Sequence, residues 1–467
     1  MGMGFVPHKK SLNALDRVFL AAESRDVMMH VGALLEFGAT EGSASDLSRE
    51  LREELKREMN VEDPWNLRLT HPDLLKSPVQ AWVPDEHFEL DYHVRRSALA
   101  SPGDERELGI LVSRLHGAPL DFHRSPWEAH FIEGLERDRL AIYFKVHHAF
   151  LDGYTGMRIL SRSLSSDPSD LKTPLFFTKA PLARPEREKD DREELVPTLD
   201  SLLRVARDQV SVAKDVGRAI MDSVRARREE DHDLALPLQA PRSILNQRVT
   251  RSRRFATQQI AVDRVKQIAA KSGGTLNDVI LAICGAALRR FLQEQGALPD
   301  RPLVAMVPVN VRPKDDPGGG NAVGAILATL ATDIDEPRKA LDAIIASTKR
   351  AKAQLQGMSK NAIIQYSALV LAPMVLSFIP GAAGRIPPAF NVVISNVPGP
   401  ESPLYFRGWR LEEMYPLSIP FHGYGLNITV QSYAGALNFG FTGCRDTIPH
   451  LQRLAVYSGE AVASLEK

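Results

Sequence analysis

Hydrophobic and polar positions alternate most clearly over residues 140–148, LAIYFKVHH. Since successive side chains of a strand point to opposite faces, this pattern predicts a strand with an apolar row on one face. His148 falls at the end of that apolar row, whereas His147 falls on the opposite, more polar face. We expect the chain to turn directly afterwards, at Asp152 and Gly153.

Three other stretches have the pattern of regular elements. Residues 303–312, LVAMVPVNVR, predict a strand that precedes the loop PKDDPGGGN. Residues 425–441 predict two strands joined by a turn at Ala434-Gly435. Residues 51–59 are charged and helix-like, so strands and helices alternate and the chain reads as an α/β protein without internal repeats.

The composition changes between residues 179 and 240. The stretch ARPEREKDDREE is almost wholly polar and contains two prolines, which is typical of a solvated linker. Apolar residues then recur in steps of three and four over residues 199–224, the spacing of one helix face. We interpret this segment as a connector helix docked on the protein body. The alternative is a basic amphipathic helix that lies on an anionic membrane.

The length of the chain predicts more than one domain, because 467 residues exceed one ordinary hydrophobic core. We place an N-terminal domain at residues 1–178, the linker and connector helix at 179–240, and a C-terminal domain at 241–467. One further segment, residues 362–379, is unusually apolar, but Pro373 interrupts it. We expect a buried or partly embedded helix there, rather than a membrane crossing.

The overall charge and the cysteine content exclude several classes of protein. Lys plus Arg and Asp plus Glu both total 58, so no net field attracts nucleic acid. The two cysteines, Cys284 and Cys444, make no disulfide framework and suit a reducing cytoplasm. The N-terminus has no apolar signal segment. We therefore expect a cytoplasmic protein.

The two histidines are the main candidates for chemistry. A histidine at the end of an apolar row is expected to stay neutral near pH 7, which is the state that a general base needs. On residue types alone, a strand with two incidental histidines is an equally good interpretation. A shared metal ion is disfavoured, because adjacent residues of a strand point to opposite faces.

Asp152 has two possible roles. Its carboxylate either shares the reaction with His148, or it is buried, pairs with an arginine and holds the loop. We favour the second role, with Arg312 at the end of its strand as the candidate partner. Losing one partner of a buried ion pair costs about 3–5 kcal/mol, so Asp152 is expected to matter even without touching a substrate.

Four motifs carry a resemblance to a known family. HHAFLDG (147–153) matches HHxxxDG, the signature of acyltransferases and condensing enzymes with the chloramphenicol-acetyltransferase-like fold. It is followed in order by SGGTLNDVILAICGAALR (272–289), VPVNVR (307–312) and NVVISNVPGP (391–400). With SLNALDRVFL and MHVGALLEF near the N-terminus and LNFGFTGCRD near the C-terminus, essentially the whole chain resembles the bacterial wax ester synthase/acyl-CoA:diacylglycerol acyltransferase family.

The resemblance implies an α/β (α+β) fold of two similar domains with mixed sheets, facing each other across a tunnel with the histidine motif at its middle. It implies transfer of a long-chain fatty acyl group from acyl-CoA to a fatty alcohol or diacylglycerol, without a further cofactor or a metal. It also implies a place at the inner membrane or on lipid inclusions. The residues expected at the site are His148, His147, Asp152, Gly153 and Asn277, with Arg312 and Asp278 as structural support.

Asn277 and Asp278 lie at the predicted start of a helix. Thr275 is the expected N-cap, which places Asn277 in the first turn, where backbone dipoles favour negative charge. Both residues would merely complete the cap in the structural interpretation. The resemblance favours Asn277 as the donor to the oxyanion or as a group that orients the histidine. Cys284 lies among apolar residues of the same helix, and we expect an inert, buried thiol.

The chain departs from the family pattern at one place and leaves other functions open. Where the family usually carries Pro-Leu-Trp, this chain has Ser125, Pro126 and Trp127, and we interpret Trp127 as a packing residue. The basic run RSRR (251–254) is the candidate to bind the phosphates of CoA, but such a run is usually solvated surface. Alternatives to lipid synthesis are a sugar, polyketide or amine acceptor, or a non-catalytic lipid-droplet binding protein.

Overall fold

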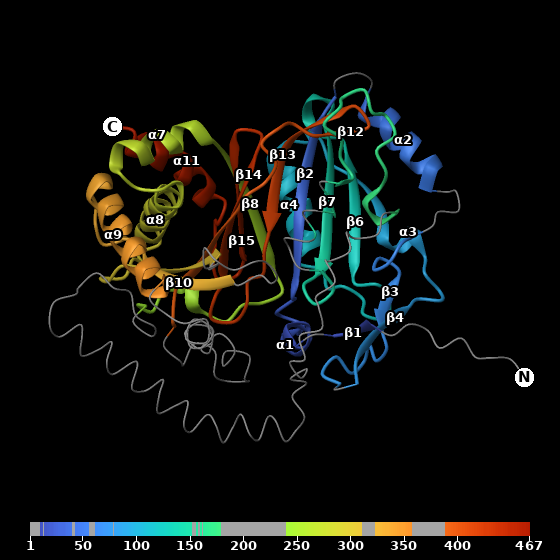
Figure 1. The fold of residues 1–467 in the computed structure, drawn as a ribbon, viewed down its shortest axis with the longest axis horizontal. Helices are drawn as coiled ribbons and strands as arrows, with labels where there is room; N and C mark the ends of the chain where they lie inside the picture. The colour runs from blue at the N-terminus through green and yellow to red at the C-terminus, as the bar shows by residue number, and fades with distance from the viewer. Residues whose placement is uncertain are drawn as a thin grey trace, which may run out of the picture.

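The computed structural model describes residues 10–12, 14–39, 43–55, 61–77, 79–151, 156, 159–160, 162–178, 240–310, 323–356 and 388–467. Two six-stranded sheets and a three-stranded sheet form the framework of this part of the chain (Figure 1). Parallel and antiparallel neighbours occur together in both large sheets, so they are mixed, as expected.

The first large sheet carries the histidine strand near its middle. Its order is β12 (Tyr405–Phe406), β13 (Trp409–Leu417), β2 (His30–Gly38), β7 (Leu140–His147), β6 (Trp127–Glu133) and β5 (Val94–Ala98). Only β5 and β6 run parallel. On one face, α2 (Ala44–Leu55) packs with Leu140, Ile142, Phe144 and Val146 of β7. On the other face, α4 (Glu105–His116) packs with Ala141 and Tyr143.

The second large sheet is covered by helices on one face. Its order is β10 (Val323–Thr329), β9 (Val304–Asn310), β11 (Val392–Val397), β14 (Leu426–Tyr433), β15 (Ala436–Cys444) and β8 (Arg253–Ala261). The covering helices are α7 (Val262–Ser272), α8 (Leu276–Glu294), α9 (Pro337–Gln356) and α11 (Arg453–Leu465), on the left in Figure 1. They close the largest hydrophobic cluster of the described residues.

The smaller elements are a three-stranded sheet and several short helices. The three-stranded sheet has the order β1 (Lys10–Ser11), β4 (Ala81–Pro84) and β3 (Leu67–Leu69). Helix α1 (Ala14–Ala22) lies below the junction of the large sheets in Figure 1. Short helical segments complete this part of the chain: α3 (Leu90–His93), η1 (Glu136–Asp138), η2 (Phe176–Thr178) and η3 (Ile244–Asn246).

Several predicted elements are confirmed. The strand predicted at 303–312 begins at Val304 and is described to Asn310. The predicted hairpin is β14 followed by β15, and Tyr433 pairs with Ala436 across a two-residue loop. Ala434 and Gly435 have φ values of 45° and 84°, and a loop with two positive φ values matches the twist of the flanking strands. Of the predicted helix 51–59, residues 51–55 lie in α2 and the rest lie outside the described residues.

One detail of the histidine strand is wrong. We expected His148 to be the last residue of the strand, but β7 ends at His147 and His148 begins a turn. The turn closes because the amides of Phe150 and Leu151 both donate to the carbonyl of His147, at 2.9 and 3.2 Å. The amide of His148 still donates to the carbonyl of Met29, in the register of β2 and β7, so the turn begins where this pairing ends.

The first large sheet contains strands from both sides of residue 241. Strands β12 and β13 belong to the C-terminal part, yet β13 pairs with β2 in the first sheet from Leu417↔Gly32 to Arg410↔Gly38. After β13 the chain continues into β14 of the second sheet. Tyr433 of β14 donates its hydroxyl to the carbonyl of Leu411 in β13 at 2.8 Å, and this bond links the two sheets. The predicted linker and connector helix at 179–239 and the apolar segment 362–379 lie outside the described residues.

The two sheets touch closely where β13 passes β15. A Cβ atom built on Gly440 would lie 2.0 Å from the carbonyl oxygen of Pro416. Helix α4 fills the neighbouring space and contacts Phe255 of β8. Among the helices in the described ranges, none has the length and hydropathy needed to span a membrane.

Candidate acyl-transfer site

His147 is the buried member of the histidine pair. Its side chain is 1% exposed, and its Nδ1 accepts a hydrogen bond from the backbone amide of Ala149 at 3.1 Å. Its Nε2 lies 3.4 Å from a carboxylate oxygen of Glu23. The ring of Phe122 meets it edge-on, with centroids 5.1 Å apart. His147 thus holds the turn together from inside.

His148 is the half-buried member of the pair. Its ring stacks on Phe19 of α1, with centroids 4.2 Å apart and an angle of 22° between the planes. Its backbone amide donates to the carbonyl of Met29 at 2.8 Å. The ring of His148 is therefore packed against Phe19, and its backbone is fixed at Met29. The neutral state that we expect for its imidazole remains a prediction.

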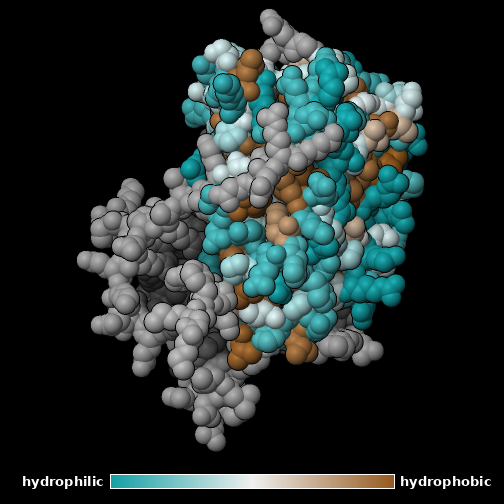
Figure 2. Space-filling model, turned by 90° about the vertical axis from the view of Figure 1, so that its right-hand side faces the viewer, coloured by the Kyte–Doolittle hydropathy of each residue, from teal (hydrophilic) through white to brown (hydrophobic). Residues whose placement is uncertain are grey.

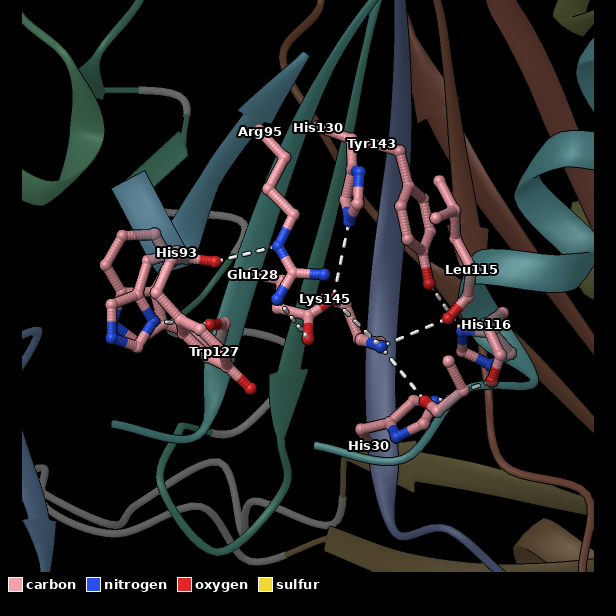
Figure 3. A network of polar contacts seen from close by, with 12 residues as sticks. His30, His93, Arg95, Leu115, His116, Trp127, Glu128, His130, Tyr143 and Lys145 are labelled. Carbon is pink, nitrogen blue, oxygen red and sulfur yellow. Dashed lines mark hydrogen bonds and ion pairs between the residues drawn. The ribbon is translucent and has the colours of Figure 1, made fainter. Parts of the chain in front are cut away.

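Beside the pair, β7 and β6 carry a buried group of charged residues (Figure 3). Lys145 is 0% exposed, and its ammonium donates to the carbonyls of Leu115 and Ala118, both at 3.0 Å, at the end of α4. Glu128 lies 3.2 Å from the same ammonium. Such pairing is what permits a buried charge, since an unpaired one would be strongly disfavoured. The contacts anchor the strand two residues before His147.

Two buried histidines line the same face of the sheet. The Nε2 atom of His30 lies 2.8 Å from the carbonyl oxygen of His116. The ring nitrogens of His116 contact the hydroxyl of Tyr143 at 2.9 Å and the carbonyl of Ser418 at 3.1 Å. Burial lowers the pKa of His116 to about 3 and holds the pKa of His30 well below its usual range. Both rings are neutral near pH 7.

Asn277 lies in the first turn of α8 and contacts the NVPGP segment. Its side-chain oxygen accepts a hydrogen bond from the amide nitrogen of Asn396 in β11, at 2.7 Å. The structure therefore joins two of the sequence motifs in one amide pair. The predicted role of Asn277 toward the oxyanion or the histidine remains a prediction.

Asp278 forms a capping box with Thr275, and Thr275 is the N-cap, as predicted. One carboxylate oxygen accepts from the backbone amide and the hydroxyl of Thr275, both at 2.7 Å. The other oxygen accepts from the hydroxyl of Thr348 in α9 at 2.6 Å. The carboxylate is buried and joins two helices, which is the geometry of a structural residue.

The remaining predicted positions have mixed outcomes. Asp152, Gly153 and Arg312 lie outside the described residues, so their pairing stays a prediction. In the RSRR run, Arg253 is buried, and its guanidinium donates to the carbonyl of Asp26 at 2.9 Å. This arginine is therefore internal and is not part of a solvated cluster for phosphate.

Both cysteines and Trp127 are packing residues. Cys284 and Cys444 are free thiols, and burial raises the pKa of Cys284 to about 12, so that it is inert, as predicted. Trp127 is fully buried, and its indole nitrogen donates to the carbonyl of Trp65 at 2.7 Å. The prediction of a structural role for Trp127 agrees with these contacts.

Sequence reasoning missed Phe19 in α1 and Glu23 directly after α1, which contact the histidine pair. Nothing in their spacing marks them, because their partners lie far away in the sequence. For Phe19 the signal was the resemblance of the segment SLNALDRVFL (11–20) to the family, whereas Glu23 lies beyond that segment. A half-buried imidazole beside a buried, hydrogen-bonded neighbour is suited to proton transfer.

Comparisons with known proteins identify the family of the chain. Residues 12–280 match the wax ester synthase/diacylglycerol acyltransferase catalytic domain, and residues 319–466 match the C-terminal domain of the same family. A Mycobacterium tuberculosis protein, named provisionally as a diacylglycerol O-acyltransferase, is 52% identical over 492 residues, covering 98% of this chain and 97% of that protein. The O-acyltransferase WSD of Acinetobacter baylyi is 37% identical over 459 residues, covering 98% and 97%.

Solved structures give the same answer for the fold. The wax ester synthase/diacylglycerol acyltransferase of Marinobacter aquaeolei has a TM-score of 0.79 and 37% identity, covering 98% of each chain. The first condensation domain of the calcium-dependent antibiotic synthetase, at 17% identity and a TM-score of 0.56, shares the fold alone. The chloramphenicol-acetyltransferase-like fold is therefore confirmed. This chain belongs to the wax ester synthase/diacylglycerol acyltransferase family.

Proposed function

We propose that this protein transfers a long-chain fatty acyl group from acyl-CoA to a fatty alcohol or to diacylglycerol, with His148 as the general base. The family membership supports the acyl transfer. The role of His148 is supported by its surroundings. The residue is half-buried in a turn, its ring stacks on Phe19, and its backbone amide is bonded to the carbonyl of Met29.

The proposed reaction needs neither a metal ion nor a covalent acyl-enzyme intermediate. His148 Nε2 takes the proton of the alcohol as its oxygen attacks the thioester carbonyl carbon. The carbon–sulfur bond then breaks, and the imidazolium returns the proton to the departing thiolate, which leaves as CoA. Proton transfer by a positioned side chain typically contributes about 10²–10⁴ in rate. Asn277 is the proposed donor to the oxyanion, and a tunnel between the two sheets is the proposed path for both substrates.

The test of the activity uses purified protein, palmitoyl-CoA and hexadecanol, with release of free CoA and formation of the ester as readouts. Diacylglycerol is offered in a parallel reaction. We expect ester formation with at least one of the two acceptors. A protein that releases CoA only with a sugar, polyketide or amine acceptor would contradict the lipid acceptor while leaving the acyl transfer intact.

The test of the base is His148→Ala, compared with His147→Ala. We expect His148→Ala to lower turnover at least about 100-fold in a folded protein, because the proton acceptor is lost. His147 is buried and bonded within the turn, so His147→Ala should mainly lower the thermal unfolding temperature. Equal losses of turnover in two well-folded variants would contradict this division of roles. If His148→Ala leaves lipid synthesis unchanged, the alternative of a non-catalytic lipid-droplet binding protein would be favoured.

We also propose that the protein associates peripherally with a membrane or lipid-inclusion surface. Figure 2 views the protein from the right-hand side of Figure 1, and its apolar residues lie in small patches among hydrophilic ones. Large exposed apolar side chains include Val18 on α1, with Leu74 and Val79 in the loop between β3 and β4. Leu75 of that loop packs in the cluster that contains Ala149 of the histidine turn. Lipid-facing residues would thus lie close to the site.

This proposal is tested by flotation with vesicles of phosphatidylethanolamine and phosphatidylglycerol. We expect the double variant Leu74→Asp, Val79→Asp to bind more weakly, because charged residues are costly in an apolar layer. Leu171→Asp is the matched control, since Leu171 and Leu74 are both 66% exposed and Leu171 lies in a different loop. Equal binding by the wild type and the double variant would contradict the assignment of this loop.

A further inference from the structure

Helix α1 presents two side chains to the histidine pair. Phe19 lies in the last part of the helix, and Glu23 follows directly after it, with its amide bonded to the carbonyl of Phe19 at 3.1 Å. Residues four apart lie on one face of a helical turn. Phe19 stacks on the ring of His148, while the carboxylate of Glu23 lies 3.4 Å from Nε2 of His147. One helical turn thus contacts both histidines.

A single oxygen of Glu23 connects the two histidines through the backbone. The Oε2 atom that faces His147 also accepts a hydrogen bond from the amide of Met29, at 2.5 Å. The carbonyl of Met29 in turn accepts the amide of His148, at 2.8 Å. The position of the His148 backbone therefore depends on the residue that Glu23 holds.

Glu23 also faces the nitrogen that carries the proton of His147. Since Nδ1 of His147 accepts the amide of Ala149, the proton of the neutral ring is on Nε2. The carboxylate of Glu23 lies 3.4 Å from this nitrogen, an electrostatic contact without hydrogen-bond geometry. A proton on Nδ1 would instead place two donors 3.1 Å apart inside the turn. A carboxylate next to Nε2 favours the tautomer that keeps the turn closed.

The side chains of Glu23 and Phe19 are both packed against neighbouring groups, which restricts their movement. The Glu23 side chain is only 8% exposed, so its carboxylate is held among neighbouring groups and is not free in solvent. Phe19 packs against the cluster of the histidine turn and also against the cluster that holds Val304 and Phe390 of the second half of the chain. Buried aromatic contacts of this kind restrict the orientation of both rings.

We propose that α1 is the positioning element of the catalytic turn, and that Glu23 is a positioning residue acting on His148 through His147 and Met29. The inference rests on the proposed function, in which His148 is the base. Glu23 does not touch the reacting atoms. It keeps His147 in one tautomer and keeps the amide of His148 at the carbonyl of Met29, so that the imidazole meets the alcohol in a fixed geometry.

The kinetic test compares Glu23→Gln with Glu23→Ala. The glutamine oxygen still accepts from Met29 and faces His147, so we expect its kcat to stay within about threefold of the wild type. Alanine removes both contacts, and we expect kcat to fall roughly 10–100-fold with little change in KM, as for a displaced catalytic group. Equal losses in the two variants, or an unchanged kcat in Glu23→Ala, would overturn the proposal.

A matched control separates positioning from general stability. Glu54 of α2 joins α2 to Arg407 through a carboxylate–guanidinium pair on another part of the first sheet. We expect Glu54→Ala to lower the unfolding temperature and to leave kcat per folded molecule unchanged. If Glu54→Ala and Glu23→Ala lose kcat alike, the effect of Glu23 is merely structural and the proposal fails.

A second readout does not depend on activity. Imidazole nitrogen NMR of protein labelled at histidine reports the tautomer, and the His147 signals are assigned by their loss in His147→Asn. We expect one Nε2–H tautomer in the wild type and in Glu23→Gln. In Glu23→Ala the turn is no longer held through Met29, so the bond from the Ala149 amide to Nδ1 should weaken and a mixture of tautomers should appear. A single, unchanged tautomer in Glu23→Ala would overturn the proposal. Retained turnover in His148→Ala would instead refute the proposed function and leave the tautomer result standing.

Discussion

At the level of single residues, the buried histidines at the start of β2 and the end of α4 link stability to pH. His116 is almost fully buried, and desolvation is the main cause that lowers its pKa to about 3 in the folded protein. The unfolded chain has the ordinary value of about 6.5. Below that value the unfolded state binds a proton that the folded state refuses, so acidification favours unfolding. The stabilising effect of keeping this ring neutral is present above about pH 6.5.

We predict that His116→Gln removes this pH dependence. The free energy of unfolding of the wild type, minus that of the variant, should fall by about 1.4 kcal/mol for each pH unit below about 6.5. Urea unfolding at several pH values between 7 and 5 measures this difference. Taking the difference also cancels the opposite slope from Glu36, whose pKa is raised mainly by burial. A difference that does not change with pH would contradict the buried, neutral state of His116.

At the level of elements, neighbouring residues at the start of α8 have separable roles. Thr275 and Asp278 bond each other in the capping box, whereas Asn277 between them bonds Asn396 of β11. Local sequence was sufficient for the cap, because its partners are three residues apart. The partner of Asn277 lies on a strand more distant in the chain, so the amide pair could not be read from spacing.

We predict that Thr275→Ala costs about 1 kcal/mol of stability, since a cap hydroxyl is lost, and leaves kcat per folded molecule unchanged. Asn277→Ala should lower kcat by about 10²–10³, if its amide stabilises the oxyanion. Chemical denaturation and single-turnover kinetics on both variants measure the two effects. The division of roles is wrong if Thr275→Ala loses as much turnover as Asn277→Ala.

At the level of the whole molecule, the two large sheets are joined where β13 passes β15. Gly440 lies there against the carbonyl of Pro416, with no room for a Cβ atom. Gly109 of α4 lies at the neighbouring contact with β8, but a Cβ atom on it would meet the carbonyl of Phe255 at an ordinary 3.6 Å. The two glycines therefore offer a matched comparison.

We predict that Gly440→Ala destabilises the protein by about 1–3 kcal/mol or more, because the added methyl group overpacks the junction of the sheets. Gly109→Ala lies within a helix and should stabilise it by about 0.5–1 kcal/mol. Thermal unfolding of the two variants distinguishes them. Similar stability of both variants would mean that the sheets are not held this closely.

The sequence by itself determined the elements whose partners are near in the chain, and the family. The strand of β7, the hairpin at Ala434-Gly435 and the cap at Thr275 all depend on local periodicity or on a turn of a few residues. The motif HHxxxDG, together with the motifs that follow it, indicated the family because residue types at fixed spacing carry the resemblance. These interactions are short-range, so a linear pattern is sufficient to predict them.

Only the tertiary structure decided what surrounds the histidines. Alternation predicted His148 as the last residue of the strand, but it begins a turn, and there its ring stacks on Phe19 and its amide is bonded to Met29, both far away in the chain. The exchange of β13 into the first sheet likewise depends on pairing with β2. These contacts join residues that are remote in the chain. A linear pattern does not specify such pairs, because many remote residues of similar hydrophobicity could pack against each other.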